Sequence, residues 1–197
     1  MRYTLHSDEK DLIQGCKQKD RLAQKYLYQR FYGKMLGICV RYTSQKSEAI
    51  DVLNQAFFKV FEKIDLYEPT GSFSGWMAKI VFHTAIDNVR RNTLYKEMID
   101  YNVEKEIGME AEIFKQLYAE DLFQVIQQLP PTSRTVFSLY VIDGYKHREI
   151  AELLNININT SKWHLAEARK KLQADLKNLN LSNNRQDPNK VGRLLNK

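Results

Sequence analysis

The chain has 197 residues, which corresponds to one large or two small domains. Apolar residues make up 43% and charged residues 27%, an ordinary globular balance that excludes a wholly disordered chain. The net charge is +6, which suits a polyanionic partner. The longest apolar run, Met35–Val40, is far shorter than the roughly 18 residues of a membrane span. Residues 1–14 show no pattern of a secretory signal.

The charge is distributed in three blocks. Residues 1–91 carry a net charge of +5, residues 92–120 carry −4, and residues 121–197 carry +5. Two basic blocks separated by an acidic spacer fit either contact with a polyanion or two solvated surfaces joined by a linker. Charge alone favours neither interpretation. Two cysteines, Cys16 and Cys39, are too few for a disulfide framework, so we expect reduced thiols and a cytoplasmic protein.

The hydrophobic period of the first block is helical. Apolar residues recur at helical spacing over 22–42, and those of 45–64 form a single stripe at steps of three and four. A turn-forming segment at 68–72 precedes another helix, which begins at Phe73 and is expected to end at Arg90–Asn92. No convincing strand alternation is present, so the sequence predicts an all-α protein with two helical domains.

The rest of the chain continues the helical pattern. The spacer is weakly periodic and predicts at most one short helix, at 111–117. A helix at 121–129 is stopped by Pro130 and Pro131, and one at 132–143 is ended by Gly144. Helices at 147–154 and from Asn159 past Leu172 follow, and the tail from Asn178 is expected to be disordered.

The last two helices, joined by a short turn at 155–157, match the helix-turn-helix plan. Asn155 in the turn tolerates left-handed backbone. One stripe of the last helix is expected to face inward: Ser161, Leu165, Ala168 and Leu172. An apolar clamp is expected from Ile150, Ala151, Ile156, Ile158 and Leu165. The opposite side carries Lys162, Trp163, Ala166, Glu167, Arg169 and Lys170.

This opposite side has the chemistry of a DNA-reading helix. Lys162 suits guanine or phosphate, Glu167 suits the amino group of cytosine, and Trp163 suits a thymine methyl or a sugar. The alternative is a helical hairpin with a solvated charged face. An exposed tryptophan among cations fits that alternative poorly, so the pattern favours DNA contact.

Two further faces depart from an ordinary amphipathic pattern. On the helix from Phe73, four residues fall on one stripe: Lys79, His83, Asp87 and Arg90. Basic groups beside aromatic rings suit single-stranded nucleic acid. The plainer alternatives are core packing of the aromatic rings and an ion pair of Asp87 with Arg90 or Arg91. On the 45–64 helix, Phe58 lies on the polar face, which favours a protein partner.

Three sets of motifs occur in one order along the chain. They are AIDVLNQAFFKVF at 49–61; FSGWMAKI at 73–80 with AID at 85–87 and RR at 90–91; and LPP at 129–131, VF at 136–137, GY at 144–145, EIAELL at 149–154, TSK at 160–162 and ARKKL at 168–172. Together they resemble an extracytoplasmic-function (ECF) sigma factor of the sigma-70 family, a promoter-recognition subunit of bacterial RNA polymerase. The sequence departs from that family's usual pattern at Gln55, His83, Asn155 and Ser161.

The resemblance implies a domain plan and three sets of site residues. Region 2 would span 1–92, an acidic linker 93–120, region 4 121–177 and a disordered tail 178–197. Polymerase contact would involve Asp51, Asn54, Gln55, Phe58, Lys59 and Glu62. Contact with the −10 element, where a base is flipped from the non-template strand, would involve Pro69, Gly71, Ser72, Phe73, Trp76, Lys79, His83, Asp87, Arg90 and Arg91. Contact with the −35 element would involve Arg148, Thr160, Lys162, Trp163, His164, Ala166, Glu167, Arg169 and Lys170.

The resemblance also implies partners and a mode of action. Core RNA polymerase, promoter DNA and an anti-sigma factor are the expected partners, and the acidic linker would thread toward the polymerase active-site channel. The chain would act by binding, with no cofactor, no metal and no bond chemistry. The rival hypothesis is a helix-turn-helix regulator that binds an operator as a dimer, with the N-terminal half as a sensor or dimerisation module. The hypothesis of an enzyme that acts on nucleic acid is not favoured, because the sequence shows no paired carboxylates, nucleophile motif or phosphate loop.

Overall fold

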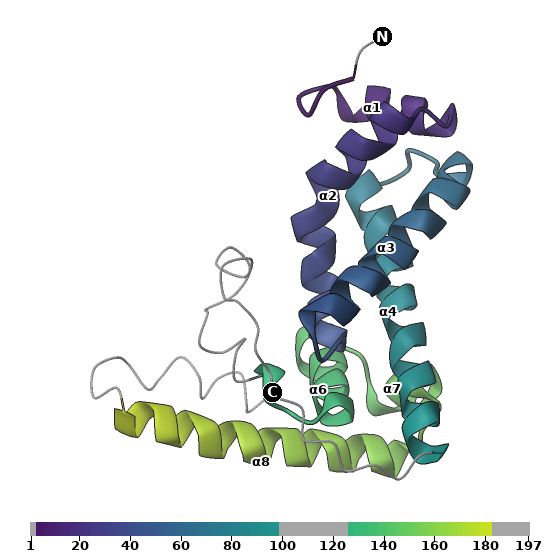
Figure 1. Cartoon of the computed structure of the whole chain (residues 1–197). Coiled ribbons are helices and arrows are strands. Elements are labelled where there is room, and N and C mark those ends of the chain that lie inside the picture. Colours follow the sequence, from purple (N-terminus) through teal and green to yellow (C-terminus); the bar gives the residue numbers. More distant parts are fainter. Residues whose placement is uncertain (1–2, 99–125, 183–197) are drawn as a thin grey trace. The chain divides into compact units, whose positions relative to one another are not determined.

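The computed structural model describes residues 3–98 and 126–182, and every regular element within these ranges is a helix (Figure 1). The chain divides into two compact units, Met1–Asn88 (unit 1) and Val89–Lys197 (unit 2). The all-α fold predicted from the sequence is confirmed. No described helix is both long and apolar enough to cross a membrane.

Unit 1 begins with α1 (Glu9–Lys17) and α2 (Arg21–Tyr42), which pack against each other. Asp20 caps α2, where its carboxylate accepts hydrogen bonds from the backbone N–H groups of Leu22 at 2.8 Å and Ala23 at 2.9 Å. The two helices approach closely at Gly15. A Cβ at this position would lie only 2.6 Å from the Cβ of Ala23, so the contact requires glycine.

The core of unit 1 lies between α2, α3 (Lys46–Lys63) and α4 (Phe73–Met98). Most of the predicted stripe of α3 is buried, Ile50 being half-buried, and Phe57 packs with its ring centroid 4.5 Å from that of Tyr28. A short 3-10 helix, η1 (Ile64–Leu66), follows α3 and contacts α1. Aromatic packing joins α2 to α4, because Phe31 and Phe73 lie edge to face at 5.8 Å.

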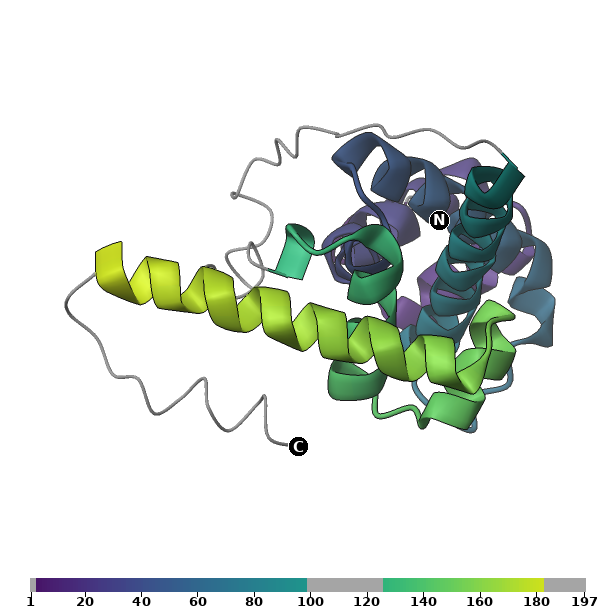
Figure 2. The ribbon, with the colours of Figure 1, turned by 90° about the horizontal axis from the view of Figure 1, so that it is seen from below.

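Unit 2 contains α6 (Pro131–Phe137), the π-helix η3 (Ser138–Ile142), α7 (His147–Leu154) and α8 (Ile158–Ser182). Figure 2 shows α8 lying across α6 and α7, with which it is in contact. Gly144 has a φ of +78°, which confirms the prediction that it ends the helix before it. The guanidinium of Arg134 is buried and donates to the backbone oxygen of Gln127 at 3.1 Å and to its side-chain oxygen at 3.0 Å.

Several expected boundaries were wrong. α4 continues to Met98 instead of ending at residues 90–92, and α8 continues to Ser182 instead of fraying at 178, because neither extension contains glycine or proline. The helix expected at 132–143 changes from α to π geometry at Ser138. The division between units falls at 88/89, inside α4. The possible helix at 111–117, most of that at 121–129 and the tail beyond 182 lie outside the described residues.

Both cysteines are buried in unit 1 as free thiols; the sequence predicted reduced thiols for both and a core position for Cys39. Burial raises the pKa of each thiol to about 12, well above the ordinary value. At neutral pH these groups are protonated and enclosed by apolar side chains of the core, so they have the character of small hydrophobic residues.

Candidate nucleic-acid and polymerase interfaces

The outward face of α3 is polar except for one aromatic ring. Phe58 is 65% exposed, although the adjacent Phe57 is 2% exposed in the core. Asn54 on this face is held by the hydroxyl of Tyr28, which donates to its side-chain oxygen at 2.9 Å. The other predicted polymerase-contacting residues of this face are exposed, or half-buried in the case of Lys59: Asp51, Gln55, Lys59 and Glu62. The structure therefore brings all six onto one helix face.

The loop before α4 is held by an aromatic cluster. The hydroxyl of Tyr67 donates to the backbone oxygen of Gly71 at 2.8 Å, which closes the loop. The ring of Tyr67 lies 4.9 Å from that of Phe73 and 5.5 Å from that of Trp76. Phe73 is only 1% exposed, so its ring supports the loop from the core and is not presented to DNA. Trp76 is half-buried.

Ser72 begins α4 by capping it. Its hydroxyl accepts from the N–H of Gly75 at 3.1 Å, and its backbone oxygen accepts from the N–H of Trp76 at 3.1 Å. Pro69, Gly71 and Ser72 are all exposed. The loop thus places an exposed turn directly beside the half-buried indole of Trp76.

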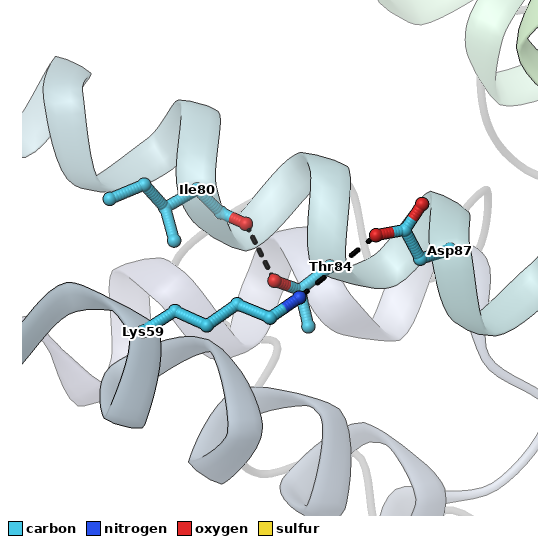
Figure 3. A network of polar contacts seen from close by, with 4 residues as sticks. All are labelled: Lys59, Ile80, Thr84 and Asp87. Carbon is cyan, nitrogen blue, oxygen red and sulfur yellow. Dashed lines mark hydrogen bonds and ion pairs between the residues drawn. The ribbon is translucent and has the colours of Figure 1, made fainter. Parts of the chain in front are cut away.

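The predicted stripe on α4 is confirmed as an outward face. Its members are exposed: Lys79, His83, Asp87, Arg90 and the neighbouring Arg91. The opposite face is buried, and there the hydroxyl of Thr84 donates back to the carbonyl of Ile80 at 2.8 Å (Figure 3). This arrangement places the basic side chains of α4 on an exposed face.

One ion pair connects the faces of α3 and α4. The ammonium of Lys59 lies 3.9 Å from a carboxylate oxygen of Asp87, with side-chain exposures of 40% and 54% (Figure 3). One alternative from the sequence was an ion pair of Asp87 with Arg90 or Arg91, whereas the structure pairs Asp87 with a residue from another helix. Only the packing of α3 on α4 reveals this contact, because the two residues are far apart in sequence.

The helix-turn-helix of unit 2 is formed as predicted. Asn155 has the left-handed backbone angles φ 54° and ψ 47°, and the side-chain oxygen of Asn157 accepts from the N–H of Asn159 at 2.8 Å as α8 begins. The inward stripe Ser161, Leu165, Ala168 and Leu172 is buried.

The expectation that Ile158 is part of the apolar clamp was wrong. Ile158 is 41% exposed, because it is the first residue of α8 and its side chain projects off the end of the helix. Ile156 is half-buried, whereas Ile150, Ala151 and Leu165 are buried as expected. The apolar clamp is therefore formed without Ile158.

The outward side of α8 presents an aromatic ring among cations. Trp163 is 59% exposed, and its ring centroid lies 4.8 Å from that of His164. The guanidinium of half-buried Arg169 lies 5.9 Å from the ring centre of Tyr140. Arg148 on α7 is exposed and lies 3.4 Å from Glu152. Four other predicted residues are exposed and Glu167 is half-buried; the four are Thr160, Lys162, Ala166 and Lys170.

Two histidines of unit 2 are engaged inside the unit. Nδ1 of His164 lies 3.0 Å from the hydroxyl of Ser133, and Nδ1 of His147 lies 3.0 Å from the hydroxyl of Ser161. Burial lowers the pKa of both imidazoles. The nearby cations Lys162 and Arg169 lower the pKa of His147 further. The family resemblance placed His164 among the −35 contacts, and neither pair had a signal in the sequence.

No group of three or more potential metal-ligating side chains occurs within residues 3–98 and 126–182. The outward faces instead combine hydrogen-bonding groups, cations and two exposed aromatic rings. Such surfaces bind macromolecules by contact and desolvation.

The chain matches family models in both units. A model of sigma-70 region 2 matches residues 27–94, and a model of sigma-70 region 4 matches residues 119–172. Together the two models match more than half of the chain.

Relatives match along most of their length. The ECF RNA polymerase sigma factor SigW of Bacillus subtilis is 29% identical over 187 residues, with 86% of this chain and 97% of that protein covered. The ECF RNA polymerase sigma-E factor of Haemophilus influenzae is 22% identical over 174 residues, with 82% and 92% covered.

A solved structure of the sigma factor RpoE in complex with the anti-sigma factor NepR, from Bartonella quintana, matches with a TM-score of 0.48 and 18% identity, covering 78% of this chain and 96% of that one. With region 2 and region 4 matched in order, and with relatives aligned over nearly their full length, this chain belongs to the sigma-70 family as an ECF sigma factor that directs transcription initiation.

Proposed function

We propose that the chain binds core RNA polymerase through the outward face of α3 and contacts promoter DNA through two separate surfaces. The exposed turn at 69–72 and the basic stripe of α4 contact the −10 element, and the first turns of α8 enter the major groove at the −35 element. One observation supports this division best. The region 2 match covers the helix that exposes Phe58, and the region 4 match covers the helix that exposes Trp163.

The polymerase contact is proposed on the surface around Phe58. Exposed aromatic rings surrounded by hydrogen-bonding groups are typical centres of protein interfaces, where they supply much of the binding energy. The fixed position of Asn54, bonded to Tyr28, supports a preformed surface. Gln55 and Glu62 lie on the same face, and both are exposed.

The −10 contact is proposed on the turn and α4. Extrusion of a base from a duplex costs a few kcal/mol, so the protein must stack and hydrogen-bond that base. The exposed turn beside Trp76 supplies an aromatic edge and backbone groups, while Lys79, Arg90 and Arg91 supply charge for phosphates. Phe73 contributes by supporting the turn from below.

The −35 contact is proposed on α8. Residues near the start of a recognition helix contact base edges, which assigns this task to Thr160, Lys162 and Trp163. Arg148 on α7 and Lys170 further along α8 suit phosphates on either side. The rival hypothesis of a dimeric regulator with a sensor domain is not favoured, because region 2 matches where that domain would lie.

The family membership extends the proposal to an anti-sigma factor as a regulator and to the cytoplasm, where the polymerase and the chromosome are found. It also supports action by binding alone, since sigma factors are regulatory subunits without catalytic chemistry.

The proposal is tested by adding the purified chain to bacterial core RNA polymerase. Co-elution and initiation from members of a promoter library are the expected results. Phe58→Ala should weaken polymerase binding by about 2 kcal/mol, roughly 30-fold. Leu66→Ala is the matched control, because Leu66 is 72% exposed but lies outside the proposed face. Tight binding to duplex DNA without binding to core polymerase would contradict the proposal and support a dimeric regulator.

A further inference from the structure

Two histidine–serine pairs join α8 to the rest of unit 2. His147 of α7 reaches Ser161 of α8, and Ser133 of α6 reaches His164 of α8, each with 3.0 Å between the hydroxyl oxygen and Nδ1. Ser161 is 0% exposed and Ser133 is 2% exposed. Each pair therefore joins a buried hydroxyl to a histidine of a neighbouring helix.

The two pairs enclose the part of α8 that is proposed to read DNA. Ser161 and His164 are three residues apart, so they lie about one turn apart on the same helix. Between them in sequence lie Lys162 and Trp163, whose side chains are exposed. One pair anchors this turn to α7 and the other anchors it to α6, and α8 packs on both helices.

The first pair is extended by an aromatic contact. The ring of His147 stacks on Tyr140 of η3, with centroids 4.6 Å apart and an interplanar angle of 29°. The guanidinium of Arg169 lies 5.9 Å from the same tyrosine ring, so Tyr140 is contacted from both α7 and α8. This arrangement connects η3, α7 and α8 through a continuous set of side chains.

Directional contacts differ from apolar packing in what they determine. An apolar side chain at position 161 would fill the same space, but it would tolerate small rotations of α8 about its axis. A buried hydroxyl loses free energy unless its hydrogen bond is made, so the helix must present Ser161 and His164 at fixed angles. The neighbouring Lys162 and Trp163 are then presented at fixed angles too.

We propose that His147–Ser161 and Ser133–His164 are positioning pairs that set the base preference of α8. None of these four residues needs to touch a base, since they act by holding Lys162 and Trp163 in register with the major groove. This inference depends on the proposed reading of DNA by α8.

The protonation state of the histidines supports the assignment. Burial favours neutral imidazoles at both positions, and for His147 the charges of Lys162 and Arg169 act in the same direction. A neutral imidazole accepts a hydrogen bond at one ring nitrogen, and each serine hydroxyl can donate to Nδ1. A role as a phosphate-binding cation is correspondingly disfavoured for His164.

The test measures base preference separately from total binding. The full chain, bound to core polymerase, is offered a duplex library randomised over the upstream promoter element, and bound sequences are counted. His147→Leu and Ser161→Ala should lower the affinity ratio between preferred and scrambled sequences about tenfold. His147→Asn should retain most of the affinity ratio, because the asparagine amide occupies the place of the histidine Nδ1 and can accept from Ser161. Ser133→Ala should lower the ratio, and His164→Asn should retain it.

The control is Thr135→Val, which removes a buried hydroxyl that bonds within α6, to the oxygen of Pro131 at 3.0 Å. It should lower stability without altering base preference. An equal loss at all sequences for Ser161→Ala and His147→Leu, with an unchanged ratio, would overturn the inference and leave the proposed function intact. A wild-type chain that shows no base preference would overturn both.

Discussion

The two units hold their functional faces in place by different means. In unit 1, α3 and α4 are positioned mainly by apolar and aromatic packing, with Phe57 and Phe73 in the core, beside a partly buried hydrogen bond from the amide of Asn88 to the carboxylate of Glu48 at 2.9 Å. In unit 2, buried polar groups join the helices, including the guanidinium of Arg134 and two histidine–serine pairs. Apolar packing supplies stability with little dependence on angle, whereas hydrogen bonds determine angle at a cost in desolvation. The unit that is proposed to read a duplex groove thus uses the more directional contacts.

The comparison is most directly tested at two adjacent phenylalanines. Phe57→Ala should destabilise unit 1 by about 3–5 kcal/mol, because it removes a buried ring that contacts Tyr28 and leaves a cavity. Phe58→Ala should change stability by about 0.5 kcal/mol or less, because the ring is exposed. Urea unfolding measures both. Similar losses for the two variants would mean that the outward face of α3 is part of the core.

A smaller effect is expected at Glu167 of unit 2. Glu167→Ala should relax base preference at one position of the −35 element by about 1–3 kcal/mol, since a carboxylate accepts from the amino group of cytosine. Binding of the variant to single-base variants of a preferred sequence measures the effect. Equal losses at every sequence would assign Glu167 to packing or to the general field of the helix.

The burial of two histidines in unit 2 should make the stability of this unit depend on pH. The folded pKa values of His147 and His164 lie below the ordinary 6.5, so the folded unit binds protons more weakly than the unfolded chain. The two neutral histidines therefore contribute to the free energy of unfolding above about pH 6.5. This contribution is lost as the pH falls through the pKa values of the folded state.

Urea unfolding at a series of pH values, with hydrogen exchange read for each unit, is the measurement. The double variant His147→Gln and His164→Gln should lose this dependence. A wild-type unit 2 whose stability did not decrease between about pH 7 and about pH 5.5 would contradict the lowered pKa values.

The smallest effect is expected for the ion pair between α3 and α4 of unit 1. The ion pair between Lys59 and Asp87 is partly exposed, so its coupling free energy should be about 0.2–1 kcal/mol and should decrease with added salt. A double-mutant cycle with Lys59→Met and Asp87→Asn measures it. A coupling free energy well above this range would show that this ion pair positions α3 on α4 more strongly than a partly exposed pair ordinarily can.

The regular parts of this fold were predictable because periodicity and stop signals are local. The stripe of α3, the stop at Gly144 and the left-handed Asn155 all follow from a few neighbouring residues. The ends of α4 and α8 were not predictable, since the absence of a breaker does not mark where a helix stops. The π-helix at Ser138 had no local signal either.

The outward faces of the helices were predictable for the same reason, but the side-chain contacts between different helices were not. Phe58 and Trp163 are anomalous within their own helices, so the sequence alone identified them. The pair Lys59–Asp87 joins residues from different helices, and so does each histidine–serine pair. The partner of each residue is decided by how the helices pack. The amphipathic pattern of a helix shows which residues face outward. It does not identify their neighbours on other helices.

The burial of both native thiols has a practical consequence. Cys16 and Cys39 are enclosed in unit 1 and have pKa values of about 12, so alkylating reagents at neutral pH encounter almost no thiolate there. A cysteine introduced at an exposed position of α8 would be the reactive one within an otherwise native sequence. A dye or crosslinker attached there would report where α8 lies on a promoter, with the natural cysteines left in place.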